Sequence, residues 1–131
     1  IQKYKKLRVQ MIVLNESQYV KLDNDAVEDF ASKVVLFIQR KHPHLADDMS
    51  QEKLHSFCKG SIIDARDKLF VLEWDACRYC WLRLVYGEEF PESLDWSRSI
   101  TEHEEYSSTY KMDLLEHYHI NFLQLAVPTP N

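Results

Sequence analysis

Apolar side chains recur every three or four residues along most of this chain, the spacing that places them on one face of an α-helix. Residues 74–86 differ because they carry two apolar stripes instead of one. The stripes are Trp74, Cys77, Trp81, Leu84 and Val85, and Tyr79, Leu82 and Tyr86. A helix that is apolar on nearly all sides is buried. Residues 74–86 are therefore predicted to form a central helix, with Gly87 as its C-cap.

Amphipathic helices are predicted before this central one. A break at residues 23–25 precedes a helix that runs to about Lys41, and Ser50 can cap a helix over about 51–68. Gly60 lies inside the second helix, where glycine costs up to about 1 kcal/mol relative to alanine. It marks either the close approach of another helix or an incidental weak point.

The remaining elements are shorter. Ser17 can cap a short helix through about Leu22, and Ser93 can cap another that carries Leu94, Trp96 and Ile100. The last helix is expected over about 108–123. Its predicted buried residues are Leu114, Leu115, Tyr118 and Phe122.

These elements amount to an all-α fold in a single domain over residues 1–131, a bundle of about five to six helices. The scarcity of glycine and proline, at 2 and 4 residues, favours long helices over a many-stranded sheet. Residues 1–14 are expected to form an extended arm or a short strand, and residues 124–131 a flexible tail.

Charge is unevenly distributed. Residues 1–87 carry 14 basic and 12 acidic side chains, whereas residues 88–131 carry 2 and 9. The acidic C-terminal third argues against a nucleic-acid-binding groove there. It either faces a basic partner or only keeps the surface soluble. No apolar run reaches the ~18 residues that cross a bilayer, so we expect a cytoplasmic protein without membrane contact.

Three features resemble chemical sites. Cys77 and Cys80 have C-x-x-C spacing, but they fall in mid-helix without a βαβ pattern, which favours buried small hydrophobic side chains over a redox pair. An odd number of cysteines, with Cys58 as the third, indicates reduced thiols. Two H-x-H pairs, His42 with His44 and His117 with His119, leave open a metal site that joins them, although no metal-binding motif supports one.

No catalytic, cofactor-binding or metal-binding residue is therefore assigned, and no enzymatic activity is expected. The remaining candidates are residues that bind a protein partner. Phe90 and Trp96 flank Pro91 outside the central helix, and they are either exposed aromatic anchors or lids over helix ends. The carboxylates of Glu102, Glu104 and Glu105 are expected to be solvated and available to a partner. Asp75 and Arg78 can pair at the rim of the central helix.

The order of motifs resembles that of small helical proteins encoded in bacterial type VI secretion and polymorphic-toxin gene clusters. The matching residues, within about 11–120, are Met11-Ile-Val-Leu14, Ser17-Gln18, Phe30, Lys41-His-Pro43, Ile62-Ile-Asp-Ala65, Cys77-Arg-Tyr79, Leu84-Val-Tyr-Gly87-Glu-Glu-Phe90 and Leu94-Asp-Trp96. The chain departs from the pattern in two places. Arg66-Asp-Lys-Leu69 stands where a glycine turn is expected, and Cys80 stands where an aliphatic residue is usual.

The resemblance implies an accessory factor that acts beside toxins, effector chaperones and spike proteins. We expect a non-enzymatic chaperone, co-chaperone or adaptor for a type VI secretion effector, in contact with the effector or with a larger chaperone. The alternative is an immunity protein that neutralises a cognate toxin, for which the acidic C-terminal third would suit a basic toxin. A small metal-dependent or thiol enzyme is a third possibility.

Overall fold

The computed structural model describes residues 21–123, and it confirms an all-α fold. The expected N-terminal arm, the helix from Ser17 and the C-terminal tail lie wholly or almost wholly outside these residues. Single helical turns flank the main helices: η2 (Asn24–Ala26), η3 (Pro43–Leu45) and the π-turn η4 (His119–Leu123). The α-helices of the described part are α2 (Val27–Lys41), α3 (Gln51–Asp67), α4 (Glu73–Tyr86), α5 (Asp95–Thr101) and α6 (Ser108–Tyr118).

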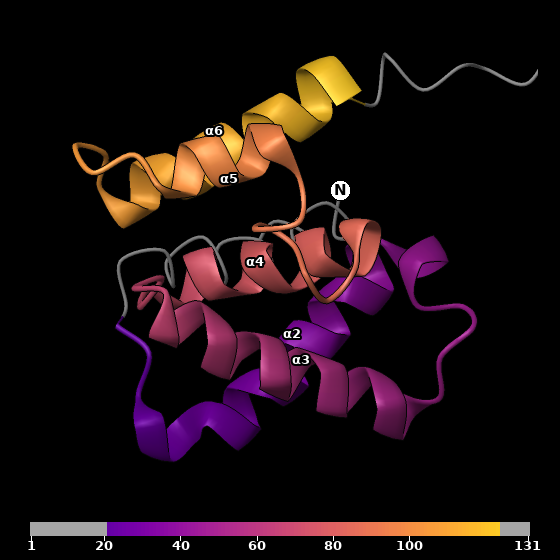
Figure 1. Cartoon of the computed structure of the whole chain (residues 1–131). Coiled ribbons are helices and arrows are strands. Elements are labelled where there is room, and N and C mark those ends of the chain that lie inside the picture. Colours follow the sequence, from indigo (N-terminus) through magenta and orange to yellow (C-terminus); the bar gives the residue numbers. More distant parts are fainter. Residues whose placement is uncertain (1–20, 124–131) are drawn as a thin grey trace, which may run out of the picture.

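Helix α4 is the centre of the molecule, as its two apolar stripes predict. Every residue from Asp75 to Leu82 is buried, so this part of the helix is covered on all sides, whereas Val85, at the end of the first predicted stripe, is 36% exposed. Helices α2 and α3 pack against one side of α4, and the α5–α6 hairpin lies on the other (Figure 1). Within the described residues, α4 is the only other α-helix that the α5–α6 hairpin contacts.

Local chemistry explains where several helices start. The hydroxyl of Ser50 accepts a hydrogen bond from the backbone N–H of Lys53 and so caps α3, as predicted. Ser107 caps α6 in the same way by accepting from Tyr110 N–H. The prediction for Ser93 is wrong, because α5 begins at Asp95 after an extended Leu94 that makes no side-chain cap.

The end of α3 contains an unusual residue. Leu69 has a φ of 72°, in the left-handed region where glycine is favoured. The backbone N–H of Phe70 donates to Ala65 C=O at 2.8 Å, and that of Leu69 donates to Arg66 C=O at 3.0 Å. These two bonds form a Schellman motif. The chain therefore makes with leucine a turn that glycine adopts more readily.

Gly60 does not mark a close helix contact within the described structure. A Cβ atom added there would meet nothing within 4 Å, and the residue is exposed. The interpretation as an incidental weak point fits this position better. Gly87, in contrast, has a φ of 104°, so the C-cap of α4 uses the conformational freedom that the sequence predicts.

Candidate partner-binding face

The two predicted aromatic anchors do not stand out from the surface. Phe90 is fully buried, so its interpretation as an exposed anchor is wrong. Its ring stacks on Tyr86 at 5.0 Å and lies 5.8 Å from the ring of Trp96. Trp96 is half-buried and also stacks on Tyr118 at 4.9 Å. These rings hold the start of α5 and the end of α6 against the end of α4, which is the role of lids over helix ends.

The three predicted acidic residues are exposed, and they lie together. Glu102, Glu104 and Glu105 occupy the connection from α5 to α6, at the opposite end of α5 from Trp96. Within this connection the His103 and Tyr106 rings are stacked, with centroids 3.7 Å apart. The fold therefore separates the acidic candidates from the aromatic ones.

Helix α6 has two apolar faces. Met112 and Leu115 are fully buried and face the core. Tyr110 and Leu114 share another side of the helix, because four residues span roughly one turn. Tyr110 is 47% exposed and Leu114 is half-buried. The ring of Tyr106 lies 4.8 Å from that of Tyr110 and extends this outer face towards the acidic connection.

This outer face was missed because the sequence prediction put Leu114, Leu115 and Tyr118 on one buried side. Consecutive residues of a helix point about 100° apart, so the adjacent leucines cannot both face the core centre. The structure buries Met112 with Leu115 and leaves Tyr118 37% exposed. The side chain of Phe122 lies outside the described residues. The i, i+4 spacing of Tyr110 and Leu114 was the available signal.

The basic side chains of the hairpin are both used internally. Arg98 donates to the Asp95 carboxylate at 2.5 Å and to the backbone oxygen of Glu92 at 3.2 Å. Lys111 donates to the backbone oxygen of Thr101 at 2.7 Å. Residues 88–131 contain only these two basic residues. The acidic connection, with Glu102, Glu104 and Glu105, therefore has no ion pair with a basic side chain of the hairpin among the described residues.

A buried ion cluster fixes α6 to α4. Arg78 of α4 donates to Asp75 and Asp113 at 2.7 Å each and to Glu116 at 3.1 Å. The hydroxyl of Thr109 donates to Asp75 at 2.8 Å. Burial opposes the charge of Arg78, but the hydrogen bonds to these carboxylates outweigh it and raise the pKa of the guanidinium. The predicted pair of Asp75 and Arg78 thus forms, although it is buried and not at a rim.

Another polar cluster joins α3 to α4. The ammonium of Lys68 donates to Asp64 at 2.8 Å and to the hydroxyl of Tyr79 at 3.1 Å, and this hydroxyl donates to Asp64. Lys68 also pairs with Glu92 at 2.6 Å, in the segment that follows α4. The cluster satisfies the hydroxyl of the buried Tyr79 and ties the Phe90 segment to α3, a structural role.

The two histidine pairs are split by the fold. His42 stacks on Trp81 with centroids 4.6 Å apart, and His119 meets the same indole edge-on at 5.6 Å. His44 and His117 are exposed. The indole of Trp81 therefore lies between one histidine of each pair. Across residues 21–123, no group of three or more His, Cys, Asp or Glu residues is arranged to hold a metal ion.

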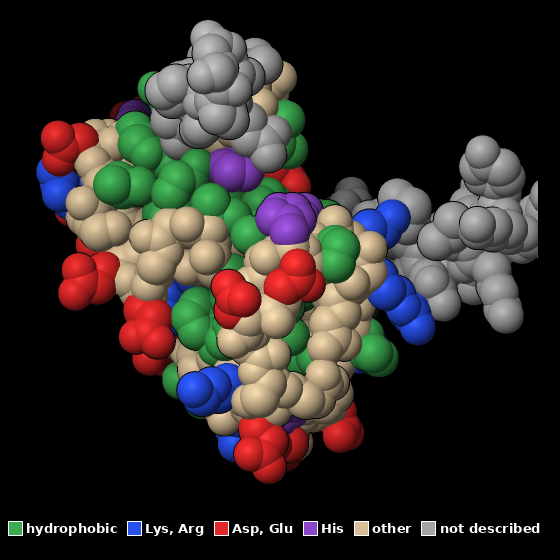
Figure 2. All heavy atoms as spheres, turned by 90° about the vertical axis from the view of Figure 1, so that its right-hand side faces the viewer, with side chains coloured by type: hydrophobic (Ala, Val, Ile, Leu, Met, Phe, Trp, Pro, Cys, Tyr) green, Lys and Arg blue, Asp and Glu red, His purple; other side chains and the backbone are tan. Residues whose placement is uncertain are grey.

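Burial lowers the pKa of both histidines that contact Trp81. For His42, the positive charges of His44, His119 and Lys41 lower the pKa further. The hydroxyl of Tyr86 shares a hydrogen bond with Nδ1 of His119. Figure 2 shows histidine side chains beside a gathering of apolar side chains on the face at the right-hand side of Figure 1. Both rings that contact Trp81 thus favour the neutral form and act as packing groups.

The cysteines are free and fully buried. Burial raises the pKa of the thiols of Cys77 and Cys80, the reverse of what a reactive pair requires. The thiol of Cys80 donates a 3.6 Å hydrogen bond to the backbone oxygen of Cys58, which joins α4 to α3. These side chains therefore behave as the small hydrophobic groups that the sequence favours.

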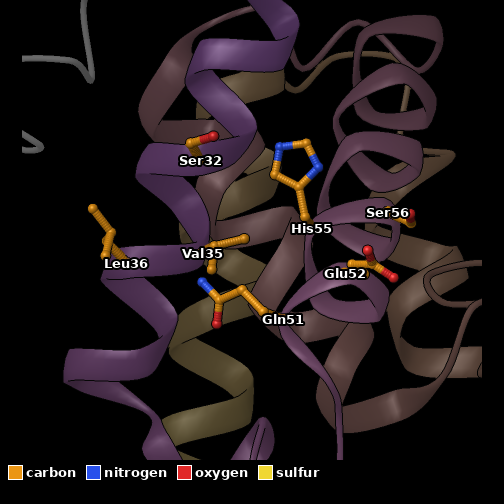
Figure 3. Close-up of a pocket in the computed structure, with 7 residues that line it drawn as sticks. All are labelled: Ser32, Val35, Leu36, Gln51, Glu52, His55 and Ser56. Carbon is orange, nitrogen blue, oxygen red and sulfur yellow. The ribbon is translucent and has the colours of Figure 1, made fainter.

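An open groove lies between α2 and α3 (Figure 3). Its volume is about 610 Å³, and its lining residues are Ser32, Val35, Leu36, Gln51, Glu52, His55 and Ser56. A neighbouring hollow of about 520 Å³ lies on the other side of Glu52 and Ser56. Both are shallow surface features with few groups that converge on one point, so the α5–α6 hairpin remains the stronger candidate site.

Comparison with known proteins adds no further constraint on the site. Neither a protein-family model, nor a curated protein, nor a solved structure matches this chain. In the part of the chain that the structure describes, each helix is too short or too polar to cross a membrane.

Proposed function

We propose that this protein is a non-enzymatic accessory factor that binds another protein, and that it acts as a chaperone, co-chaperone or adaptor for a bacterial type VI secretion effector. The observation that carries the proposal is the outer face of the α5–α6 hairpin. Exposed Tyr110 and half-buried Leu114 lie there, and Glu102, Glu104 and Glu105 are exposed in the connection that leads into the same helix. The motif resemblance supplies the type VI context.

Such a face has the make-up of a protein-binding site. Tyrosine gives a large contact area at a small cost in conformational entropy, and it is enriched among the residues that dominate binding energy. A charged border around apolar side chains favours one partner over others and speeds association. The core beneath the face is firmly packed, since α6 is tied to α4 by the Arg78 cluster and by the rings around Tyr86.

The test uses the gene in its native host. Deletion is expected to lower the intracellular level or the secretion of one effector encoded in the same cluster, and a plasmid copy should restore it. A copy carrying Tyr110→Ser and Leu114→Ser should restore it poorly, whereas Leu36→Ser should restore it fully. Leu36 is the matched control, because it is a 49% exposed apolar residue on α2. An unchanged effector level and secretion after deletion would contradict the proposal.

An immunity protein is the second candidate, and the charge of the hairpin favours it. Residues 88–131 carry 9 acidic and 2 basic side chains, and both bases are engaged internally, which suits a basic toxin. Co-expression separates the two functions. An immunity protein rescues cells from the toxin, whereas a chaperone or adaptor raises the level or export of the effector without rescue.

A further inference from the structure

We infer that the partner presents a basic amphipathic helix, which packs lengthwise on the outer face of α6. Tyr110 and Leu114 would form the apolar contact, and the acidic connection would pair with basic residues of the partner helix. This inference rests on the proposed function and names the chemistry of the partner at that site.

The apolar part of the face has the form of a helical ridge. Tyr110 and Leu114 are separated by four residues, about 6 Å along the axis of α6. Ridges of i, i+4 residues pack into the grooves of another helix, which is the commonest mode of helix pairing in globular proteins. Tyr106 adds a third apolar group at the N-terminal end of this ridge, through its contact with Tyr110.

The charge of the face selects a basic partner. Glu102, Glu104 and Glu105 are exposed within four consecutive positions. Arg98 and Lys111 are already bonded to atoms of the hairpin. A partner with lysine or arginine beside its apolar stripe would therefore gain attraction, whereas an acidic partner would be repelled.

Geometry favours a helix over an extended segment as the occupant. A common way to bind an extended peptide is to add it to the edge of a sheet, where main-chain hydrogen bonds supply the affinity. The described residues offer a single isolated bridge between Lys21 and Leu72 and no strand, so such an edge does not exist in this part of the chain. A helix binds through its side chains, and the groove between its own side chains can take an apolar ridge such as that of Tyr110 and Leu114.

The test is a titration of the full chain with designed peptides. The probe is a leucine–lysine peptide of about 18 residues with helical periodicity, long enough to form a stable helix. Its counterpart has every lysine replaced by glutamate. Binding is followed by fluorescence anisotropy of a labelled peptide and by amide chemical shifts of the protein. We expect the basic peptide to bind, the acidic one not to bind, and the shifts to map to residues 102–118.

Matched variants test whether the peptide binds to this face or is only attracted by the net negative charge of the protein. Tyr110→Ser with Leu114→Ser should weaken binding about tenfold or more, the cost of losing contacts at the centre of an interface. Leu36→Ser should leave it unchanged. Replacing Glu102, Glu104 and Glu105 by glutamine should weaken binding and flatten its salt dependence. The equally exposed acids Asp47, Asp48 and Glu52, changed in the same way, should have less effect.

Several outcomes would overturn the inference. One is equal binding of the basic and the acidic peptide, and another is equal loss from the two sets of acid substitutions. Shifts confined to the α2–α3 groove would assign the peptide to that groove instead. The basic segment with Lys3, Lys5, Lys6 and Arg8 is the other possible occupant. Stronger peptide binding after these four residues are replaced by glutamine would mean that this segment, and not a partner, binds the face.

Failure here is distinguishable from failure of the proposed function. If effector export requires the protein but tolerates Tyr110→Ser with Leu114→Ser, the function stands and the binding face is wrong. If gene deletion leaves the effector unchanged while the peptide results hold, the face binds basic helices and the proposed function is wrong.

Discussion

Asp113 on α6 accepts a 2.7 Å hydrogen bond from Arg78 on α4, although the carboxylate is 55% exposed and the guanidinium is buried. The bond therefore reaches from the surface into the interior of the molecule. Within the cluster Arg78 also neutralises Asp75, whose side chain is 1% exposed. The hairpin that carries the candidate binding face is thus held by a charge that cannot be removed without leaving another one buried.

Arg78→Met is expected to destabilise the protein by about 3–5 kcal/mol, because it leaves the Asp75 carboxylate buried without its partner. Urea unfolding followed by circular dichroism measures the change. Arg98→Met is the control, since Arg98 pairs with the 92% exposed Asp95 and such pairs contribute about 0–1 kcal/mol. Similar losses for the two variants would show that the Arg78 cluster does not hold the hairpin.

Leu69→Gly is expected to stabilise the protein by about 1 kcal/mol. The left-handed conformation of Leu69 costs about 1–2 kcal/mol for a residue with a Cβ, and part of this gain is offset by the greater freedom of glycine in the unfolded chain. Leu69 is 69% exposed, so little packing is lost. Leu69→Ala removes the side chain but keeps the Cβ, and its unfolding midpoint should stay near that of the parent chain. A stabilised alanine variant would refute the backbone explanation.

The protein is expected to lose stability between pH 7.5 and 5.5. Burial holds the pKa of His42 and His119 below the ordinary value of 6.5, which the unfolded chain retains. The unfolded state therefore binds protons first as the pH falls, so the contribution present above about 6.5 is lost below it. Urea midpoints across this range measure the effect. The variant His42→Gln with His119→Gln should show a flatter profile, and a parallel profile would contradict the assignment.

The cysteine thiols are expected to be unreactive in the folded protein. All three are fully buried, and burial raises the pKa of Cys77 and Cys80. An aromatic disulfide reagent should release no colour from the native chain, and it should report three thiols once denaturant is added. Fast reaction of one thiol without denaturant would revive a redox role for the C-x-x-C pair.

The fold could be predicted wherever a sequence pattern is compatible with only one structure. The two apolar stripes of residues 74–86 can only be satisfied by burial on all sides, and the structure buries Asp75 to Leu82 accordingly. Ser50 was identifiable as a cap because it directly precedes the amphipathic stretch of α3, whereas Ser93 lies one position before Leu94, the N-cap residue of α5. The helix predicted to follow the break at residues 23–25 and to run to about Lys41 is α2, which ends at Lys41.

The candidate site was less predictable, because it depends on which neighbours the fold supplies. Phe90 looked available in the sequence, and it is buried because Tyr86 and Trp96 come from both sides. Leu114 and Leu115 look equivalent along the chain, and only the side of α6 against which α4 packs decides which of them faces the core. Glu102, Glu104 and Glu105 are exposed as predicted, since carboxylates in a short connection between helices remain solvated, and their role in partner binding stays a prediction.

Helix α4 is the only α-helix of the described part that contacts both the α5–α6 hairpin and the two N-terminal helices, α2 and α3. A bound protein that displaces α6 would therefore act first on α4. The indole of Trp81 belongs to α4 and lies between His42 at the end of α2 and His119 at the end of α6. In a variant that keeps Trp81 as its one tryptophan, fluorescence is therefore expected to report a displacement of α6 when a partner binds.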